Sequence, residues 1–143
     1  MFVSPPDSSV LKRKCANMAD RVYRSNRNTL PVVELLRSHP SVEQDHPSLR
    51  PTNPWYEKVK RRDGGPENLL SVVFRRPNFA RHFYDSLDVC KGSSFGTNFT
   101  LADPSVQLAC YCDQDKCGEY GLPKHIICIS VGLEDLKNIV RRI

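Results

Sequence analysis

Five side chains that can ligate a soft metal ion lie close together near the end of the chain. They are Cys110, Cys112, Cys117, His125 and Cys128. Structural zinc sites hold four such ligands in a tetrahedron. The spacing is irregular, without a CxxC pair, and Cys128 belongs to the apolar run 126–131. We therefore predict that Cys110 and Cys128 are packed and that Cys112 and Cys117 lie on an exposed turn. A zinc-binding or non-catalytic interaction module that uses the Cys110–Cys128 cluster remains an alternative function.

The lysines are the second group of candidates, because a lysine amine can form a Schiff base. Such a lysine must be desolvated or must lie next to another cation. Most lysines of this chain stand in charged clusters or polar turns, so we expect them to be solvated. The eight are Lys12, Lys14, Lys58, Lys60, Lys91, Lys116, Lys124 and Lys137. Other catalytic signatures, such as a glycine-rich phosphate loop, G-x-S-x-G or H-E-x-x-H, are absent from the sequence.

Composition and charge narrow the classes of partner. The net charge is +5 over 143 residues, but the basic residues are scattered in short clusters rather than interleaved with aromatic residues. We expect an ordinary solvated surface and no nucleic-acid partner. No apolar run has the ~20 residues that a membrane helix needs, so we expect no membrane contact. The first residues lack the pattern of a secretory signal, which favours a reducing, cytoplasmic location.

Hydrophobic periodicity predicts the elements that position these residues. Apolar residues recur at helical spacing from Val10 to Leu36, with a break expected near Asn28 because Pro31 cannot donate a backbone hydrogen bond. Residues 40–66 are rich in proline and glycine and predict a loop, apart from a very short strand at Val42. Strands are predicted at 69–74, 89–90, 99–101 and 126–131, and helices at 78–87, 104–111 and 133–140. A polar turn is predicted at 112–118.

This order of elements predicts the fold class α+β, with a small, mostly antiparallel sheet and helices on one face. We expect a long linker or interface helix over residues 1–39 and a small domain over 40–143. Both ends look incomplete. The first helix has no preceding element to pack against, and the closing helix ends abruptly at Ile143. The pattern suits the back end of a longer protein.

Three blocks of sequence resemble one enzyme family, in the family's order. Thr29–Glu43 resembles the segment ending in SHPxVE that opens the small domain of the Cys/Met-metabolism enzymes. Lys91–Thr97 resembles their Ser-Leu-Gly loop, and His125–Asp135 resembles their closing IRxSVGLED block. These enzymes are pyridoxal-phosphate-dependent transsulfuration enzymes of fold type I. The sequence at residues 64–65, 88–92 and 96–101 is most similar to that of fungal cystathionine γ-synthase-like proteins.

The resemblance implies carbon–sulfur chemistry on an amino-acid substrate, in the methionine and cysteine pathways, by a homo-oligomeric transferase or lyase. In that family a lysine holds pyridoxal phosphate as a Schiff base, and the cofactor acts as electron sink while the γ-substituent is eliminated or replaced by a thiol. The family's large domain carries this lysine and the other cofactor contacts, so the resemblance implies that this chain has none of them. We expect a C-terminal fragment that is inactive alone.

The resemblance also implies two substrate-binding positions. An arginine in the IRxSVG strand binds the substrate carboxylate, since a guanidinium fork matches it with two hydrogen bonds. Cys128 stands at that position here, and a thiol cannot replace the fork. Ser94 stands at the serine of the Ser-Leu-Gly loop, with Phe95 for the leucine. We expect Cys128→Arg to restore carboxylate binding, and neither His125 nor Arg141 to act as its substitute.

Overall fold

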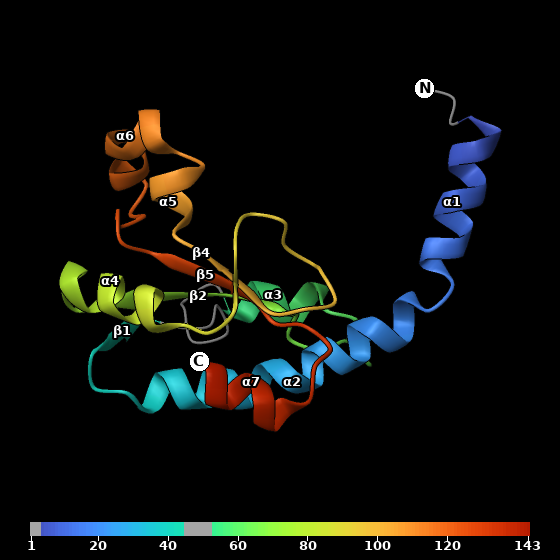
Figure 1. Ribbon diagram of the computed structural model, residues 1–143, viewed down its shortest axis with the longest axis horizontal. Coiled ribbons are helices and arrows are strands. Elements are labelled where there is room, and N and C mark those ends of the chain that lie inside the picture. Colours follow the sequence, from blue (N-terminus) through green and yellow to red (C-terminus); the bar gives the residue numbers. More distant parts are fainter. Residues whose placement is uncertain (1–3, 45–52) are drawn as a thin grey trace.

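A computed structural model of the chain describes residues 4–44 and 53–143. A sheet lies at its centre, with helices packed below it and a smaller helical segment above it in Figure 1. The strands are β1 (Val42–Gln44), β2 (Leu69–Phe74), β3 (Cys90–Lys91), β4 (Leu101–Asp103) and β5 (Ile127–Ser130). The helices are α1 (Pro5–Cys15), α2 (Met18–Ser38), α3 (Asn53–Val59), α4 (Pro77–Ser86), α5 (Ser105–Leu108), α6 (Gln114–Glu119) and α7 (Leu136–Arg142), with a 3₁₀ turn over Tyr111–Asp113.

The five strands pair in the order β1-β2-β5-β4-β3. All pairs are antiparallel except β3 with β4, which run parallel. The fold is therefore α+β with a mostly antiparallel sheet, which confirms the predicted class. The two strands with the strongest sequence signal, β2 and β5, form the centre and place Leu70 opposite Ile129 and Val72 opposite Ile127. No helix among the described residues has both the length and the apolar character needed to cross a membrane.

The hydrophobic core lies between one face of this sheet and helices α2, α4 and α7. Side chains of a strand alternate between its two faces, so every second residue of β2 and β5 faces these helices. Residues from all these elements form one cluster. Its members are Val32, Val33, Leu36, Leu70, Val72, Phe74, Ala80, Leu87, Ala102, Ile127, Ile129, Val131 and Ile139. We call this side of the sheet the core face and the other side the open face.

The first helical segment divides at Ala16–Asn17, so the predicted break near Asn28 is wrong. Pro31 lies inside α2. The helix continues through it because Val32, Val33 and Leu36 are buried in the core, and this burial outweighs one lost backbone hydrogen bond. Helix α1 buries no residue and leads away from the rest of the molecule (Figure 1). The division of the chain into an interface helix over 1–39 and a small domain over 40–143 stays a prediction.

Two predictions of irregular structure are also wrong. Helix α3 with Trp55 occupies part of the predicted loop 40–66, while residues 45–52 lie outside the described ranges. Helix α6 occupies most of the predicted polar turn at 112–118. It forms because Cys110 and Cys117 pack against a second small cluster on the open face, made of Val73, Val106 and Ile126. A seven-residue polar pattern does not reveal such distant partners.

Candidate functional site

The open face of the sheet carries Cys128, one of the two substrate-binding positions that the resemblance predicts. Cys128 pairs directly with Ser71 of β2 on one side and with Asp103 of β4 on the other. Directly opposite residues of an antiparallel pair point to the same face, so the three side chains form a row across it. The thiol is half-buried, and its Sγ lies 3.3 Å from the hydroxyl oxygen of Ser71. Cys128 is thus a partly exposed residue, not the fully packed one that the sequence predicts.

Asp103 is the residue of this row that sequence reasoning missed. Its side chain is only 1% exposed. One carboxyl oxygen accepts a hydrogen bond of 2.8 Å from the Ser105 hydroxyl. The other, Oδ1, is buried and has no hydrogen-bond partner among the described residues. An acidic residue in the last position of an otherwise apolar strand was the only signal for it in the sequence. An unpaired buried carboxyl oxygen is costly, so this position favours a hydrogen-bond donor at 128.

The loop that contains Ser94 is attached to this same open face. The backbone N–H of Gly96 donates a 2.9 Å hydrogen bond to the hydroxyl of Ser130. Ser130 is two residues from Cys128 on β5, so both side chains lie on the open face. Gly96 adopts φ +85°, a conformation that glycine reaches without strain. Ser94 is exposed on this loop. The direct role of Ser94 and Cys128 in substrate binding stays a prediction.

The segment after β5 ties the loop to the rest of the molecule. Glu134 accepts hydrogen bonds from the backbone N–H and the hydroxyl of Thr100, at 2.6 and 3.0 Å. The Thr100 hydroxyl in turn accepts the N–H of Gly132 at 3.0 Å. From the other side, the Asn28 amide donates to the carbonyls of Gly132 and Glu134. The VGLED block therefore joins helix α2 to the end of the Ser94 loop.

Gly132 is fixed by close backbone packing in this junction. A Cβ atom there would lie 2.5 Å from the Phe99 carbonyl carbon and 2.6 Å from the Thr100 nitrogen. Real Cβ atoms do not come so close to backbone atoms, so only glycine fits. The sequence showed this glycine merely as the residue that ends a strand.

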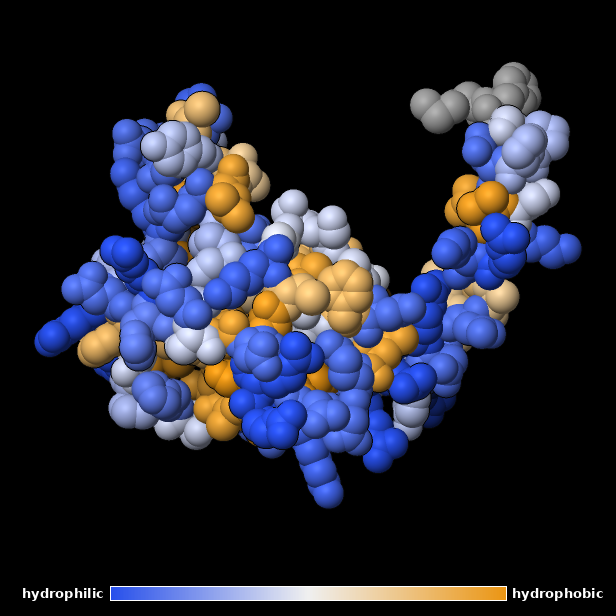
Figure 2. All heavy atoms as spheres, in the orientation of Figure 1, coloured by the Kyte–Doolittle hydropathy of each residue, from blue (hydrophilic) through white to orange (hydrophobic). Residues whose placement is uncertain are grey.

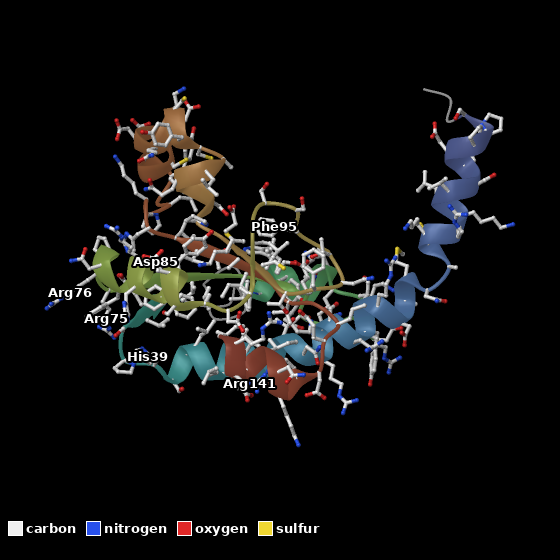
Figure 3. All side chains as sticks on the ribbon, in the orientation of Figure 1. His39, Arg75, Arg76, Asp85, Phe95 and Arg141 are labelled. Carbon is white, nitrogen blue, oxygen red and sulfur yellow. The ribbon has the colours of Figure 1, made fainter. Side chains whose placement is uncertain are left out.

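His125 and Arg141 lie away from the row around Cys128. The Nε2 of His125 is 2.9 Å from the carbonyl of Phe74, and since a carbonyl only accepts, the ring N–H donates there. Arg141 belongs to α7, which packs on the core face. Figure 3 shows it on the side of the sheet opposite to Phe95 of the Ser94 loop. Neither residue belongs to the row formed by Ser71, Cys128 and Asp103.

The lysines do not fit a Schiff-base site for pyridoxal phosphate. Lys60 is half-buried and the other seven are exposed. Lys60, Lys116 and Lys124 form ion pairs with Glu57, Asp113 and Asp115. A Schiff-base lysine must be desolvated or lie next to another cation, and none of these lysines is buried. The lysines of this chain therefore do not provide a site for a Schiff base with pyridoxal phosphate.

The structure does not bring the five predicted metal ligands together. His125 binds the Phe74 carbonyl, Cys128 contacts Ser71, and Cys112 is exposed. Cys110 and Cys117 pack side by side on the small cluster. Burial, and then the neighbouring Cys110, raise the pKa of the Cys117 thiol. Within residues 4–44 and 53–143, no group of three or more His, Cys, Asp and Glu side chains is arranged to hold a metal ion. The prediction that Cys117 lies on an exposed turn is wrong, because its side chain is half-buried.

Comparison with known proteins supports the family that the three sequence blocks predict. Residues 1–143 match the family described as Cys/Met metabolism PLP-dependent enzyme. The chain is 44% identical over 140 residues to the cystathionine gamma-synthase-like protein ankD of Aspergillus thermomutatus, covering 97% of this chain and 25% of the relative. It is 36% identical over 137 residues to the cystathionine gamma-synthase of Neurospora crassa, covering 95% and 22%. The chain thus spans about a quarter of these relatives.

Solved structures show the same fold. The cystathionine gamma-lyase of Lactobacillus plantarum, complexed with L-serine, superposes with a TM-score of 0.80 at 21% identity, over 99% of this chain and 38% of that one. The cystathionine gamma-lyase CalE6 of Micromonospora echinospora gives 0.79 at 23% identity, over 95% and 36%. On the match over its whole length and the identity to the fungal proteins, this chain belongs to the Cys/Met metabolism family of PLP-dependent enzymes.

Proposed function

We propose that this chain is the C-terminal small domain of a cystathionine γ-synthase-like transsulfuration enzyme, and that its open face borders the amino-acid substrate. The observation that carries the proposal is the Gly96–Ser130 hydrogen bond, because it holds the Ser94 loop over the face that bears Cys128. The identity to fungal relatives over nearly the whole chain supports the same assignment.

In this proposal the chain supplies substrate contacts, and the lysine that binds pyridoxal phosphate comes from protein outside these 143 residues. The chain alone is inactive. The complete protein is a homo-oligomer of the cytoplasm that serves methionine and cysteine metabolism, by exchange or elimination of a γ-substituent. Ser94 contributes one neutral hydrogen bond to the substrate. Cys128 leaves the substrate carboxylate without the charged fork that arginine supplies in the family.

A chimera tests the proposal. This chain replaces the matched segment of the Neurospora crassa cystathionine γ-synthase, and the chimera is assayed for bound cofactor, substrate Kd and turnover. We expect the chimera to hold the cofactor, because its anchors lie in the relative's part, and to bind amino-acid substrate weakly. Cys128→Arg combined with Asp103→Asn should tighten substrate binding by about 10-fold or more, as a charge-assisted pair contributes about 1.5–3 kcal/mol.

Ser94→Ala should weaken substrate binding by only a few-fold, and the neighbouring Ser93→Ala is its matched control. A folded chimera that loses the cofactor would contradict the proposed place of this domain. A chimera with Cys128 that already binds substrate as tightly as the fungal enzyme would show that the carboxylate is held elsewhere.

A further inference from the structure

An apolar groove lies on the core side of the molecule, where the end of α2 meets α4 and α7. Its volume is about 490 Å³, within the range of small-molecule sites. The floor includes Leu36, Phe74 and Phe83, and the rings of Phe74 and Phe83 are 4.9 Å apart. Figure 2 shows hydrophobic atoms at the surface between these helices. The groove lies across the sheet from Cys128, so it is separate from the proposed substrate face.

Exposed apolar side chains continue the groove to its rim. Leu35 is 40% exposed and Phe79 is 41% exposed, although both contribute to the lining. Leaving this much apolar surface in water is unfavourable unless a ligand covers it. The groove therefore suits the apolar body of a ligand.

Two cations, Arg75 and Arg76, lie beside one end of this groove. The guanidinium carbon of Arg76 lies 5.8 Å above the centre of the Phe79 ring. The Nε of Arg75 donates a 2.9 Å hydrogen bond to the carbonyl of Pro40, which lies between two lining residues, His39 and Ser41. Figure 3 shows His39, Arg75 and Arg76 at the same edge of the molecule.

His39 adds a hydrogen-bond donor to this end. Its Nδ1 accepts the backbone N–H of Ser41 at 3.3 Å. In the neutral ring the proton therefore sits on Nε2, which is left as a donor. Among the described residues, the contact of Arg75 with Pro40 uses its Nε–H, so the two terminal nitrogens of its guanidinium group have hydrogens for an anion.

No Asp or Glu side chain of the described residues forms an ion pair with a cation at this end. The groove lining contains no Asp or Glu in that part of the chain. Asp85 pairs with Arg81 and Asp88 pairs with Arg142, at 3.7 and 3.2 Å. Neither Arg75 nor Arg76 has an ion-pair partner within the described ranges.

We propose that this groove binds a small monocarboxylate with an apolar body, with the body on Leu36, Phe74 and Phe79 and the carboxylate at Arg75, Arg76 and His39. An apolar floor with cations at one end matches the two halves of such a molecule. An uncharged hydrocarbon would leave the arginines without a partner, and an alkylammonium ion would be repelled.

Titration of the ¹⁵N-labelled chain with sodium octanoate tests this proposal. We expect saturable shifts of the amides of residues 39–42, 74–86 and 140–143, and none at 128–130. The variant Arg75→Gln/Arg76→Gln should weaken octanoate binding by about 10-fold, because charge-assisted hydrogen bonds are lost. Octan-1-ol should bind both proteins equally and more weakly than octanoate binds the unaltered chain.

Two further variants separate the charged end from the apolar floor. Arg81→Gln on helix α4 should leave octanoate affinity unchanged, since Arg81 pairs with Asp85 and lines a different cavity. Leu35→Ser should weaken octanoate and octan-1-ol alike. Equal affinity for octanoate and octylammonium, or an unchanged affinity in the double arginine variant, would overturn the proposal. So would shifts outside the groove, or binding only to phosphatidylcholine–phosphatidylglycerol vesicles and not to free octanoate.

Discussion

In the proposed function, two neighbouring residues, Cys128 and Asp103, determine whether the open face can bind a carboxylate. They lie directly opposite each other on β5 and β4, and Asp103 has a buried carboxyl oxygen without a partner among the described residues. The sequence alone suggested that arginine at 128 would restore substrate carboxylate binding. The structure adds a competing acceptor next to it. An arginine at 128 therefore pairs first with Asp103, and restoration requires that Asp103 be neutralised as well.

A double-mutant cycle measures this competition. We expect Cys128→Arg to be more destabilising in the Asp103→Asn background than in the presence of Asp103, by about 1.5–3 kcal/mol, because only the carboxylate provides a charged acceptor. Urea unfolding of the four proteins gives the coupling. Cys128→Ala, which provides no hydrogen-bond donor, is the control and should show almost no coupling with Asp103→Asn. Equal effects of Cys128→Arg in both backgrounds would show that the two side chains do not meet.

Gly132 gives a second prediction at the residue scale. Gly132→Ala places a Cβ against the backbone of Phe99 and Thr100, so we expect a loss of about 2–3 kcal/mol in the free energy of unfolding. Gly118→Ala is the matched control, because a Cβ there meets no atom within 4 Å and alanine favours the helix. Urea unfolding compares them. A Gly132→Ala protein as stable as the unaltered chain would refute the close packing of the VGLED block.

At the scale of elements, the two N-terminal helices have different roles. Helix α2 contributes Val32, Val33 and Leu36 to the core, whereas α1 has no buried residue. The buried apolar stripe also explains why Pro31 does not end α2. Helicity here is set by tertiary burial, which local propensity does not report.

Removal of α1 tests this division. A chain that begins at Met18 should keep its free energy of unfolding to within about 0.5 kcal/mol, since no buried contact is lost. Leu36→Ala, which removes buried side-chain atoms of α2, should cost about 2–5 kcal/mol. Thermal and urea unfolding measure both. A large loss of stability without α1 would mean that this helix contributes packing energy that its exposure does not indicate.

For the molecule as a whole, the key question is where the cofactor lysine resides. All eight lysines are exposed or half-buried, and the chain spans about a quarter of its fungal relatives. The proposed function places the cofactor site in protein outside this chain and the substrate face on the open side of the sheet.

Reductive labelling checks this assignment. After incubation with pyridoxal phosphate and borohydride, we expect the label to be spread over several exposed lysines, because none is desolvated enough to react preferentially. Peptide mass spectrometry locates the label. Lys60→Arg, the change at the least exposed lysine, should leave the total labelling nearly unchanged. Stoichiometric labelling of one lysine would contradict the assignment and would identify a cofactor site within the chain.

The sequence by itself determined the α+β class, the two central strands and the family. These depend on local patterns: β-branched runs at 69–74 and 126–131, helical spacing in α2, and three short blocks in a fixed order. Such patterns can be recognised from the sequence because the hydrophobic period of a helix or strand appears in consecutive residues.

Only the tertiary structure decided which side chains meet. The register of β4 and β5 places Asp103 next to Cys128, although 24 residues separate them in the chain. In the described residues the five sulfur and imidazole ligands do not come together as a metal site, and distant packing makes the 114–119 segment helical. Strand register and side-chain burial depend on contacts between residues far apart in sequence, so no local pattern specifies them.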